Sequence, residues 1–137
     1  RRPATKKVAD FIGTMNFIPA TIMSEAGDKV EVEAKGLGRV ALDIAQAPAT
    51  TGDSPVVGLR PETLTLLYDD QKAAERETEG VIDEVIYFGD MTYYDVYLGG
   101  TDVEVRLSMR NVPGRPVLEV GTRVRVAWSP SALVLFR

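Results

Sequence analysis

Residues 30–35 read VEVEAK, and apolar side chains alternate with charged side chains along this stretch. Val30, Val32 and Ala34 share one side of an extended chain, because successive side chains of a β-strand point to opposite faces. This period of two predicts a strand with one face in the core and the other in solvent. Similar alternation returns along most of the chain, which predicts an all-β protein.

Other short segments repeat this pattern and are bounded by glycine, proline or polar turn residues. They are residues 17–23, 40–44, 56–59, 64–68, 81–88, 94–98, 103–107, 124–128 and 133–136. About five strands fall in each half of the chain, which is the strand content of an OB-like barrel. No stretch shows the alternation of strand and long helix that builds an α/β domain. The sequence therefore predicts two small OB-like β-barrel lobes.

The N-terminal segment has the only convincing helical period in the chain. Its apolar residues recur at i, i+3, i+4 and i+7 and would share one helix face: Val8, Phe11, Ile12 and Met15. Thr5 could cap the start of this helix, and Gly13 lies where a glycine commonly ends one. We expect a short amphipathic helix over residues 5–14.

The division of the chain into lobes follows from its composition. Residues 69–79, DDQKAAERETE, contain almost no large apolar side chain and predict a joint. We therefore expect a helical lead-in over residues 1–16, a first lobe over 17–68 and a second lobe over 80–137. The chain opens with Arg1-Arg2-Pro3 and no initiator methionine, so we also expect a fragment of a longer protein.

Two local features of the second half should shape its strands. The acidic pair Asp83-Glu84 interrupts the apolar stretch 81–88, which is typical of a β-bulge in a strand that curls around a small barrel. Gly99-Gly100 predicts a two-residue hairpin, because glycine tolerates the positive φ of primed turns. Aromatic residues surround the turn at Gly89-Asp90 and could fill a core or interface, or stack on bases: Tyr87, Phe88, Tyr93, Tyr94 and Tyr97. We favour packing because the chain is acidic.

Composition excludes several classes of chemistry. The 137 residues include no cysteine and no histidine. This removes disulfides, thiol catalysis, the commonest general base and the commonest transition-metal ligand. The net charge of -4 and the sequence pI near 4.9 disfavour a nucleic-acid-binding face. No apolar run approaches the roughly 20 residues of a membrane-spanning helix.

The motifs of common enzyme classes are missing as well. The chain contains no Gly-Lys pair, so it lacks the loop that holds phosphates in P-loop ATPases. It has no G-x-S-x-G and no G-x-G-x-x-G, and without histidine a Ser-His-Asp triad is impossible. Asp69-Asp70 and Asp83-Glu84 could bind a hard cation, but neighbouring strand residues point to opposite faces. We therefore predict no catalytic residue, no bound cofactor and no metal site.

The segment Gly58–Glu62, GLRPE, predicts a rigid corner. Pro61 lacks a backbone donor and fixes φ, so it ends the preceding strand sharply. Arg60 and Glu62 are then held at this corner, where an arginine can form a bidentate pair with a carboxylate. Two interpretations stay open: a local ion pair that stabilises the corner, or a contact of Arg60 or Glu62 with a partner subunit or a neighbouring domain.

Three motifs follow one another along the chain. They are Phe11-Ile12-Gly13 with Asn16, Phe17 and Pro19; then GLRPE; then Tyr87-Phe88-Gly89-Asp90 with Val124–Trp128 and Pro130. In this order they resemble the transport-associated OB-like (TOBE) region that follows the ATPase domain in ABC-type solute importers. Sugar importers of this kind usually have Ser-Pro after the first motif, where this chain has Thr14-Met15. The third motif is similar to the spermidine/putrescine type.

The resemblance implies a regulatory and dimerisation domain with no catalysis of its own. The parent would be the ATP-binding subunit of a polyamine-type importer, cytoplasmic and held at the inner face of the membrane through the transporter complex. Implied partners are a second copy of the subunit, its own ATPase domain and the membrane permease subunits, with no nucleic acid. ATP and magnesium would bind in the ATPase domain. Candidate contact residues are Phe11, Asn16, Arg60, Pro61 and Glu62.

Two other functions stay open at this point. The chain could come from a sugar or iron importer, because this domain does not encode the transported solute. It could also be a small-ligand sensor, since related OB-like domains bind oxyanions. Arg60 and the backbone amides near the glycine turns motivate that second alternative.

Overall fold

The computed structural model describes residues 15–47 and 54–137. The described residues form ten β-strands, three 3-10 turns and no α-helix. The strands are β1 (Asn16–Ala26), β2 (Lys29–Ala34), β3 (Gly38–Asp43), β4 (Val56–Leu59), β5 (Thr65–Leu67), β6 (Arg76–Phe88), β7 (Met91–Leu98), β8 (Glu104–Arg110), β9 (Arg123–Trp128) and β10 (Val134–Phe136). The turns are η1 (Ile44–Gln46), η2 (Pro61–Thr63) and η3 (Pro130–Ala132). The all-β class is confirmed, and the helix expected over residues 5–14 lies outside the described residues.

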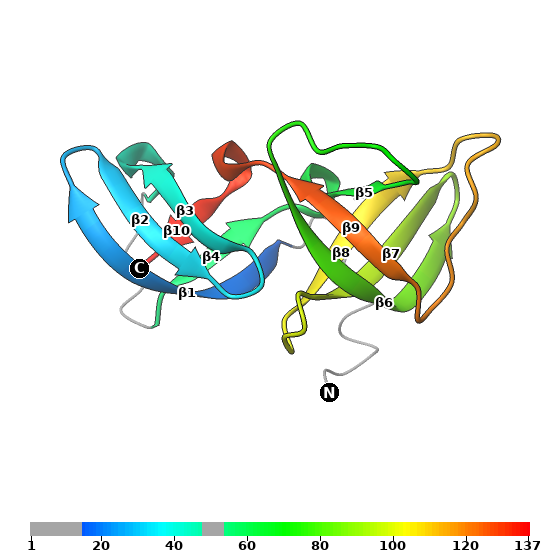
Figure 1. Ribbon diagram of the computed structural model, residues 1–137, viewed down its shortest axis with the longest axis horizontal. Helices are drawn as coiled ribbons and strands as arrows, with labels where there is room; N and C mark the ends of the chain where they lie inside the picture. The colour runs from blue at the N-terminus through cyan, green and yellow to red at the C-terminus, as the bar shows by residue number, and fades with distance from the viewer. Residues whose placement is uncertain (1–14, 48–53) are drawn as a thin grey trace.

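Two five-stranded antiparallel sheets make two lobes that lie side by side (Figure 1). The strand order is β10-β4-β1-β2-β3 in the first lobe and β5-β9-β6-β7-β8 in the second. In each lobe a long central strand, β1 or β6, pairs with its hairpin partner on one side and with a later strand on the other. The two lobes therefore share one topology.

One of the two edge strands of each sheet comes from the other half of the chain. The C-terminal β10 pairs with β4 in the first lobe, and β5, which follows β4 in sequence, pairs with β9 in the second. Figure 1 shows β10, drawn in red, among the blue and cyan strands. The lobes predicted over residues 17–68 and 80–137 did not include this exchange of strands. A period of two shows which face of a strand is buried but not which strand is its neighbour.

The joint expected over residues 69–79 is shorter than predicted. β6 begins at Arg76, and its first residues pair with β9, from Arg76 opposite Trp128 to Glu79 opposite Arg125. A polar stretch can form a strand here because the backbone supplies the ladder while Glu77 and Glu79 are exposed. At the other boundary, Asn16 opens β1 and does not belong to a lead-in.

The bulge and one of the two predicted turns have the expected form. The β6–β7 register shifts between Ile82 and Glu84, which confirms the bulge. Phe88 pairs with Met91, so Gly89-Asp90 is a two-residue turn. Gly99 and Gly100 do have positive φ values of 48° and 72°. However, Leu98 N–H donates to the Val103 carbonyl at 2.9 Å, so the β7–β8 loop is longer than the predicted two residues.

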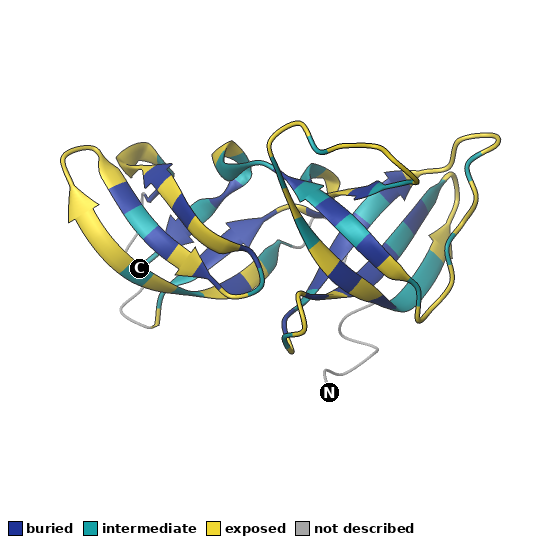
Figure 2. Ribbon diagram, viewed as in Figure 1, coloured by how far each residue is buried: buried dark blue, intermediate teal, exposed yellow. Residues whose placement is uncertain are grey.

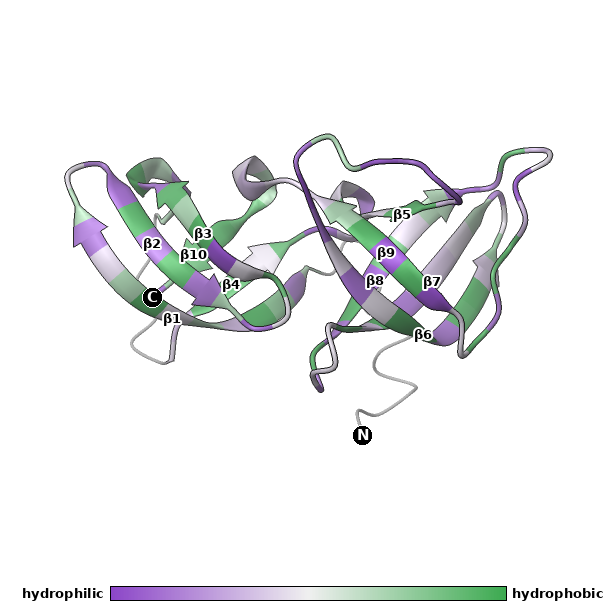
Figure 3. Cartoon of the chain, in the orientation of Figure 1, coloured by the Kyte–Doolittle hydropathy of each residue, from purple (hydrophilic) through white to green (hydrophobic). Residues whose placement is uncertain are grey.

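The core runs through both lobes as one apolar cluster (Figure 2). Val30, Val32 and Ala34 are fully buried, as their alternation predicted. Figure 3 shows hydrophobic and hydrophilic residues alternating along β2 and β3. Of the aromatic residues around Gly89-Asp90, Tyr94 is buried in the core, whereas Tyr87 and Phe88 are exposed.

Candidate functional site

The described candidate residues meet at one strand, β8 in the second lobe. Asn16 starts β1 beside β8, and η2, which carries Pro61 and Glu62, contacts the same strand. Arg60 immediately precedes η2. Phe11 lies outside the described residues. Segments far apart in the sequence are thus brought together at the junction of the two lobes.

The side chain of Asn16 binds the backbone of Arg106 from across the junction. Asn16 Oδ1 accepts from the Arg106 N–H at 2.8 Å, and Asn16 Nδ2 donates to the Arg106 carbonyl at 2.9 Å. The bond between Leu98 and Val103 sets the alternation of the β7–β8 ladder, so the Arg106 backbone groups face away from β7. The primary amide of Asn16 therefore occupies the place of a neighbouring strand at this edge.

The side chain of Arg106 forms a buried ion pair with Asp95, its cross-strand neighbour on β7. Arg106 Nε lies 2.7 Å from Asp95 Oδ1, and Arg106 Nη2 lies 2.9 Å from Asp95 Oδ2. The side chains are 8% and 2% exposed. Breaking such a pair from one side costs about 3–5 kcal/mol, because the remaining buried charge loses this hydrogen-bonded partner. Arg106 is therefore held at its backbone by Asn16 and at its guanidinium by Asp95.

The corner at η2 is built by its proline and by backbone hydrogen bonds. Thr63 N–H donates to the Arg60 carbonyl at 3.0 Å, and Leu64 N–H donates to the Pro61 carbonyl at 3.3 Å. Pro61 is buried, whereas Arg60 and Glu62 are exposed. The local ion pair between Arg60 and Glu62, one of the two interpretations from the sequence, does not form in the described structure. Side chains two residues apart in a helical turn do not face each other.

Two turns are crossovers, because each carries the chain from one lobe to the other: η2 leads from β4 to β5, and η3 leads from β9 to β10. The two crossovers are structural counterparts. Ala132 N–H donates to the Ser129 carbonyl at 3.0 Å, and Leu133 N–H donates to the Pro130 carbonyl at 3.2 Å. Both turns follow the pattern Pro-x-x-Leu-x-Leu, from Pro61 to Leu66 and from Pro130 to Leu135. The leucines in both copies are at most 1% exposed. This repeat was the sequence signal for the strand exchange, and sequence reasoning missed it.

A second contact between the lobes lies at the β2–β3 turn. Thr78 Oγ1 donates to the Gly36 carbonyl at 2.7 Å, and Lys35 Nζ donates to Asp102 Oδ1 at 2.8 Å. The hydrogen bond from the Lys35 ammonium lowers the pKa of the Asp102 carboxyl. Gly36 has a φ of +91°, and a Cβ there would lie 2.8 Å from Leu98 Cβ. Only glycine allows this close approach of the turn to β7.

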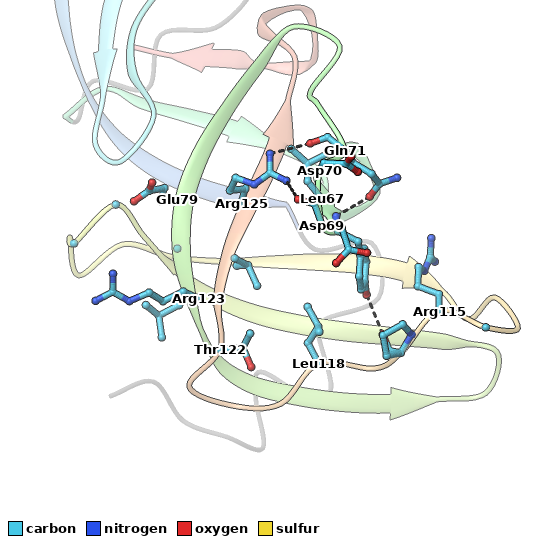
Figure 4. Close-up of a pocket in the computed structure, with 18 of the residues that line it drawn as sticks. Leu67, Asp69, Asp70, Gln71, Glu79, Arg115, Leu118, Thr122, Arg123 and Arg125 are labelled. Carbon is cyan, nitrogen blue, oxygen red and sulfur yellow. Dashed lines mark hydrogen bonds between the residues drawn. The ribbon is translucent and has the colours of Figure 1, made fainter.

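A groove of about 1100 Å³ opens on the second lobe (Figure 4). It is lined by residues 67–71, 79–81, 99–100, 113–116, 118 and 122–125. Arg125 shapes one wall by donating to the carbonyls of Gln71 at 2.9 Å and Asp69 at 2.8 Å. Arg123, on the same strand, makes no ion pair in the described structure. The sequence analysis named some of the lining residues for other reasons, among them Gly99-Gly100 and Asp69-Asp70, but it predicted no groove.

Burial raises the pKa of Tyr68, beside this groove, to about 12, and neighbouring Tyr94 adds to the effect. Tyr68 Oη donates to the Pro116 carbonyl at 3.2 Å. The described residues hold no cluster of three His, Cys, Asp or Glu side chains placed to bind a metal. They also contain no helix with the length and hydrophobicity to cross a membrane.

Comparison with known proteins assigns the chain to a family. Residues 57–136, which include η2, β8 and η3, match the TOBE domain. The chain belongs to the TOBE domain family. The match contains both Pro-x-x-Leu-x-Leu crossovers of this TOBE domain, together with all of the second lobe.

Relatives of this TOBE domain are similar over nearly all of its length. It is 34% identical over 128 residues to the spermidine/putrescine import ATP-binding protein PotA of Pseudomonas aeruginosa, covering 92% of this chain and 35% of that protein. Against PotA of Nitrosomonas europaea it is 34% identical over 134 residues, covering 95% of this chain and 36% of that protein. The domain thus spans about a third of the length of the curated relatives it matches.

A solved structure with the same fold is the cytoplasmic molybdate-binding protein ModG in crystals with molybdate bound. The TM-score is 0.62 at 14% identity, and the alignment covers 89% of this chain and 94% of ModG. At this identity the likeness bears on the fold alone. It agrees with the OB-like architecture of the TOBE domain.

Proposed function

We propose that this TOBE domain regulates and dimerises the ATP-binding subunit of an ABC importer, with polyamines as the transported class. The observation that carries the proposal is the 34% identity to PotA over 92% of the chain. The domain has no reaction of its own, because its sequence lacks a P-loop, histidine and cysteine. ATP and magnesium bind in the ATPase domain of the parent subunit.

The partners follow from the same proposal. They are a second copy of the subunit, the ATPase domain of the parent subunit, and the permease subunits at the cytoplasmic face of the membrane. Nucleic acid is not among them, because the net charge is -4. Pairing of two TOBE domains would keep the two ATPase domains at high effective concentration between cycles of ATP binding.

The junction at β8 gives this role a physical basis. β1 belongs to the first lobe, but its first residue, Asn16, is hydrogen-bonded to β8 of the second. A displacement of the chain that enters β1 therefore acts on both lobes. The exchanged strands β5 and β10 join the lobes further, so the domain responds as one body.

A chimeric transporter tests this function. The matching segment of Pseudomonas aeruginosa PotA is replaced by this chain, and spermidine uptake and ATP hydrolysis are measured in reconstituted vesicles. We expect uptake to persist and to stay coupled to hydrolysis. An ATPase subunit that assembles with its permease but no longer drives uptake would contradict the proposal. Uptake of a sugar or iron by the parent transporter would instead favour the alternatives raised from the sequence.

Oxyanion binding is a second candidate function, favoured by Arg123, which lines the groove and makes no ion pair in the described structure. The fold likeness to a molybdate-binding protein makes molybdate the first ligand to test. Calorimetry of this chain against molybdate, sulfate and phosphate should show heat that Arg123→Gln abolishes. Absence of heat with all three anions would dispose of this candidate.

A further inference from the structure

The two crossovers of the fold provide an internal comparison for the GLRPE corner. η2 and η3 have the same proline at their first position, the same pair of backbone hydrogen bonds and the same buried leucine after the turn. The positions of Arg60 and Glu62 in η2 are taken by Ser129 and Ser131 in η3. The turn therefore forms without either charge, and the fold does not explain why η2 carries both.

Arg60 and Glu62 also have no role in holding the described lobes together. Both are exposed, and in the described structure neither forms an ion pair or a side-chain hydrogen bond. Buried Pro61 lies between them and anchors the corner against the core, so the two charges stand on a rigid base. Two opposite charges, two residues apart and without partners among the described residues, form a small patch that is complementary to itself.

We propose that Arg60 and Glu62 form a symmetric contact between two copies of this chain. In a two-fold interface the same patch meets itself, so Arg60 of one copy faces Glu62 of the other, and Glu62 faces Arg60. Each arginine can bind the opposite carboxylate through two parallel hydrogen bonds. The inference rests on the proposed dimerisation role and names the surface that carries it.

Charge reversal separates this contact from a general effect of charge. Arg60→Glu gives a corner with two negative charges, and Glu62→Arg gives a corner with two positive charges. Each variant alone should repel its own copy and weaken self-association on the order of tenfold at low ionic strength. An equimolar mixture of the two should associate at least as well as the original chain. The double variant Arg60→Glu/Glu62→Arg should regain self-association, because its patch is again self-complementary.

Sedimentation equilibrium measures these affinities, and circular dichroism checks that each variant is folded. Ser131→Glu is the matched control, since it adds an exposed charge at the η3 position that corresponds to Glu62. It should leave self-association unchanged. High salt should reduce the differences between the variants, because exposed charges are screened.

The outcomes separate this inference from the proposed function. If the original chain dimerises and both single variants dimerise equally well, the contact at Arg60 and Glu62 is wrong while dimerisation stands. If the Ser131→Glu control weakens the dimer as much as the reversals do, the contact is also wrong. If neither the original chain nor the mixture associates, the dimerisation role falls together with this contact.

Discussion

At the scale of single residues, Arg106 links the two lobes. Its backbone bonds to Asn16 from the first lobe, and its guanidinium bonds to Asp95 within the second. The bonds from Asn16 pair an edge of β8 whose backbone would otherwise lack a neighbouring strand, and the ion pair with Asp95 joins β8 to β7. A change at either partner therefore has a cost that depends on what is left unsatisfied at Arg106.

Asp95→Ala should strongly destabilise the domain. It removes one side of a buried ion pair, and we expect the free energy of unfolding to fall by about 3–5 kcal/mol. Urea titration followed by fluorescence of the single tryptophan measures this change. Asp90→Ala is the control, because the Asp90–Arg110 pair is 72% and 71% exposed and should contribute little. Equal effects of the two substitutions would show that burial of the pair does not matter.

Asn16→Ala should loosen the junction without removing any apolar contact of the core. It leaves the N–H and carbonyl of Arg106 without the Asn16 amide, which costs about 1–3 kcal/mol. Hydrogen exchange should show faster exchange of the Arg106 amide, whereas the amide of Val96 on β7 stays protected. Unchanged protection of Arg106 would mean that Asn16 does not hold this edge.

Tyr68 should make stability depend on pH in the alkaline range. Its folded pKa is raised to about 12, above the ordinary value of 10.0. A group with a raised folded pKa contributes stability that is present below the unfolded pKa and is lost as pH rises through the folded pKa. Stability should therefore fall between about pH 10 and 12, and Tyr68→Phe should make this fall less steep. The step near pH 12 in the tyrosinate absorbance titration should disappear in the same variant.

At the scale of elements, short turns decide how the strands are joined. The β2–β3 turn reaches β7 because Gly36 lets its backbone approach Leu98. Gly38, in the same turn, has the same φ of +91°, but a Cβ added there would have nothing within 4 Å. Comparing substitutions at Gly36 and Gly38 therefore separates the free-energy cost of a positive φ from the cost of crowding the contact between the lobes.

Gly36→Ala should destabilise more than Gly38→Ala. Both substitutions cost roughly 1–2 kcal/mol for a left-handed backbone. Only Gly36→Ala also overpacks the contact with Leu98, which adds about 1–3 kcal/mol. Chemical denaturation of the two variants measures the difference. Equal losses of stability would indicate that the turn does not press on β7.

At the scale of the whole molecule, the exchange of β5 and β10 makes each lobe depend on both halves of the chain. The first lobe cannot complete its sheet until β10 has returned from the second, and the second needs β5. The apolar cluster is continuous across the junction. These features favour a single cooperative unfolding transition.

Leu135→Ala tests this cooperativity. Leu135 is fully buried in β10 of the first lobe, and its truncation should cost about 2–5 kcal/mol. Trp128, on β9, reports on the second lobe, and the amides of Val30 and Val32 report on the first. The unfolding transitions followed by Trp128 fluorescence and by exchange of these amides should shift together to a lower denaturant midpoint. A shift confined to the first lobe would show that the lobes unfold separately.

Much of the local structure was predictable because its causes are local. Alternation along Val30–Ala34 identified both the strand and its buried face. The acidic interruption at Asp83-Glu84 located the bulge, and the motifs predicted the family. Gly99-Gly100 was correct as a turn with positive φ but wrong as a two-residue hairpin, since loop length depends on how the flanking strands pair.

The amino-acid sequence by itself determined the all-β class, which faces of its alternating strands are buried, and the family of the chain. Each of these follows from residue types, their spacing and short motifs. Only the tertiary structure decided that β5 and β10 change lobes, that Asn16 takes the place of a strand beside Arg106, and that Arg60 and Glu62 do not pair. The physical reason is that a strand's edge hydrogen bonds can be made by any partner that reaches them, so the choice of partner depends on how the whole chain packs.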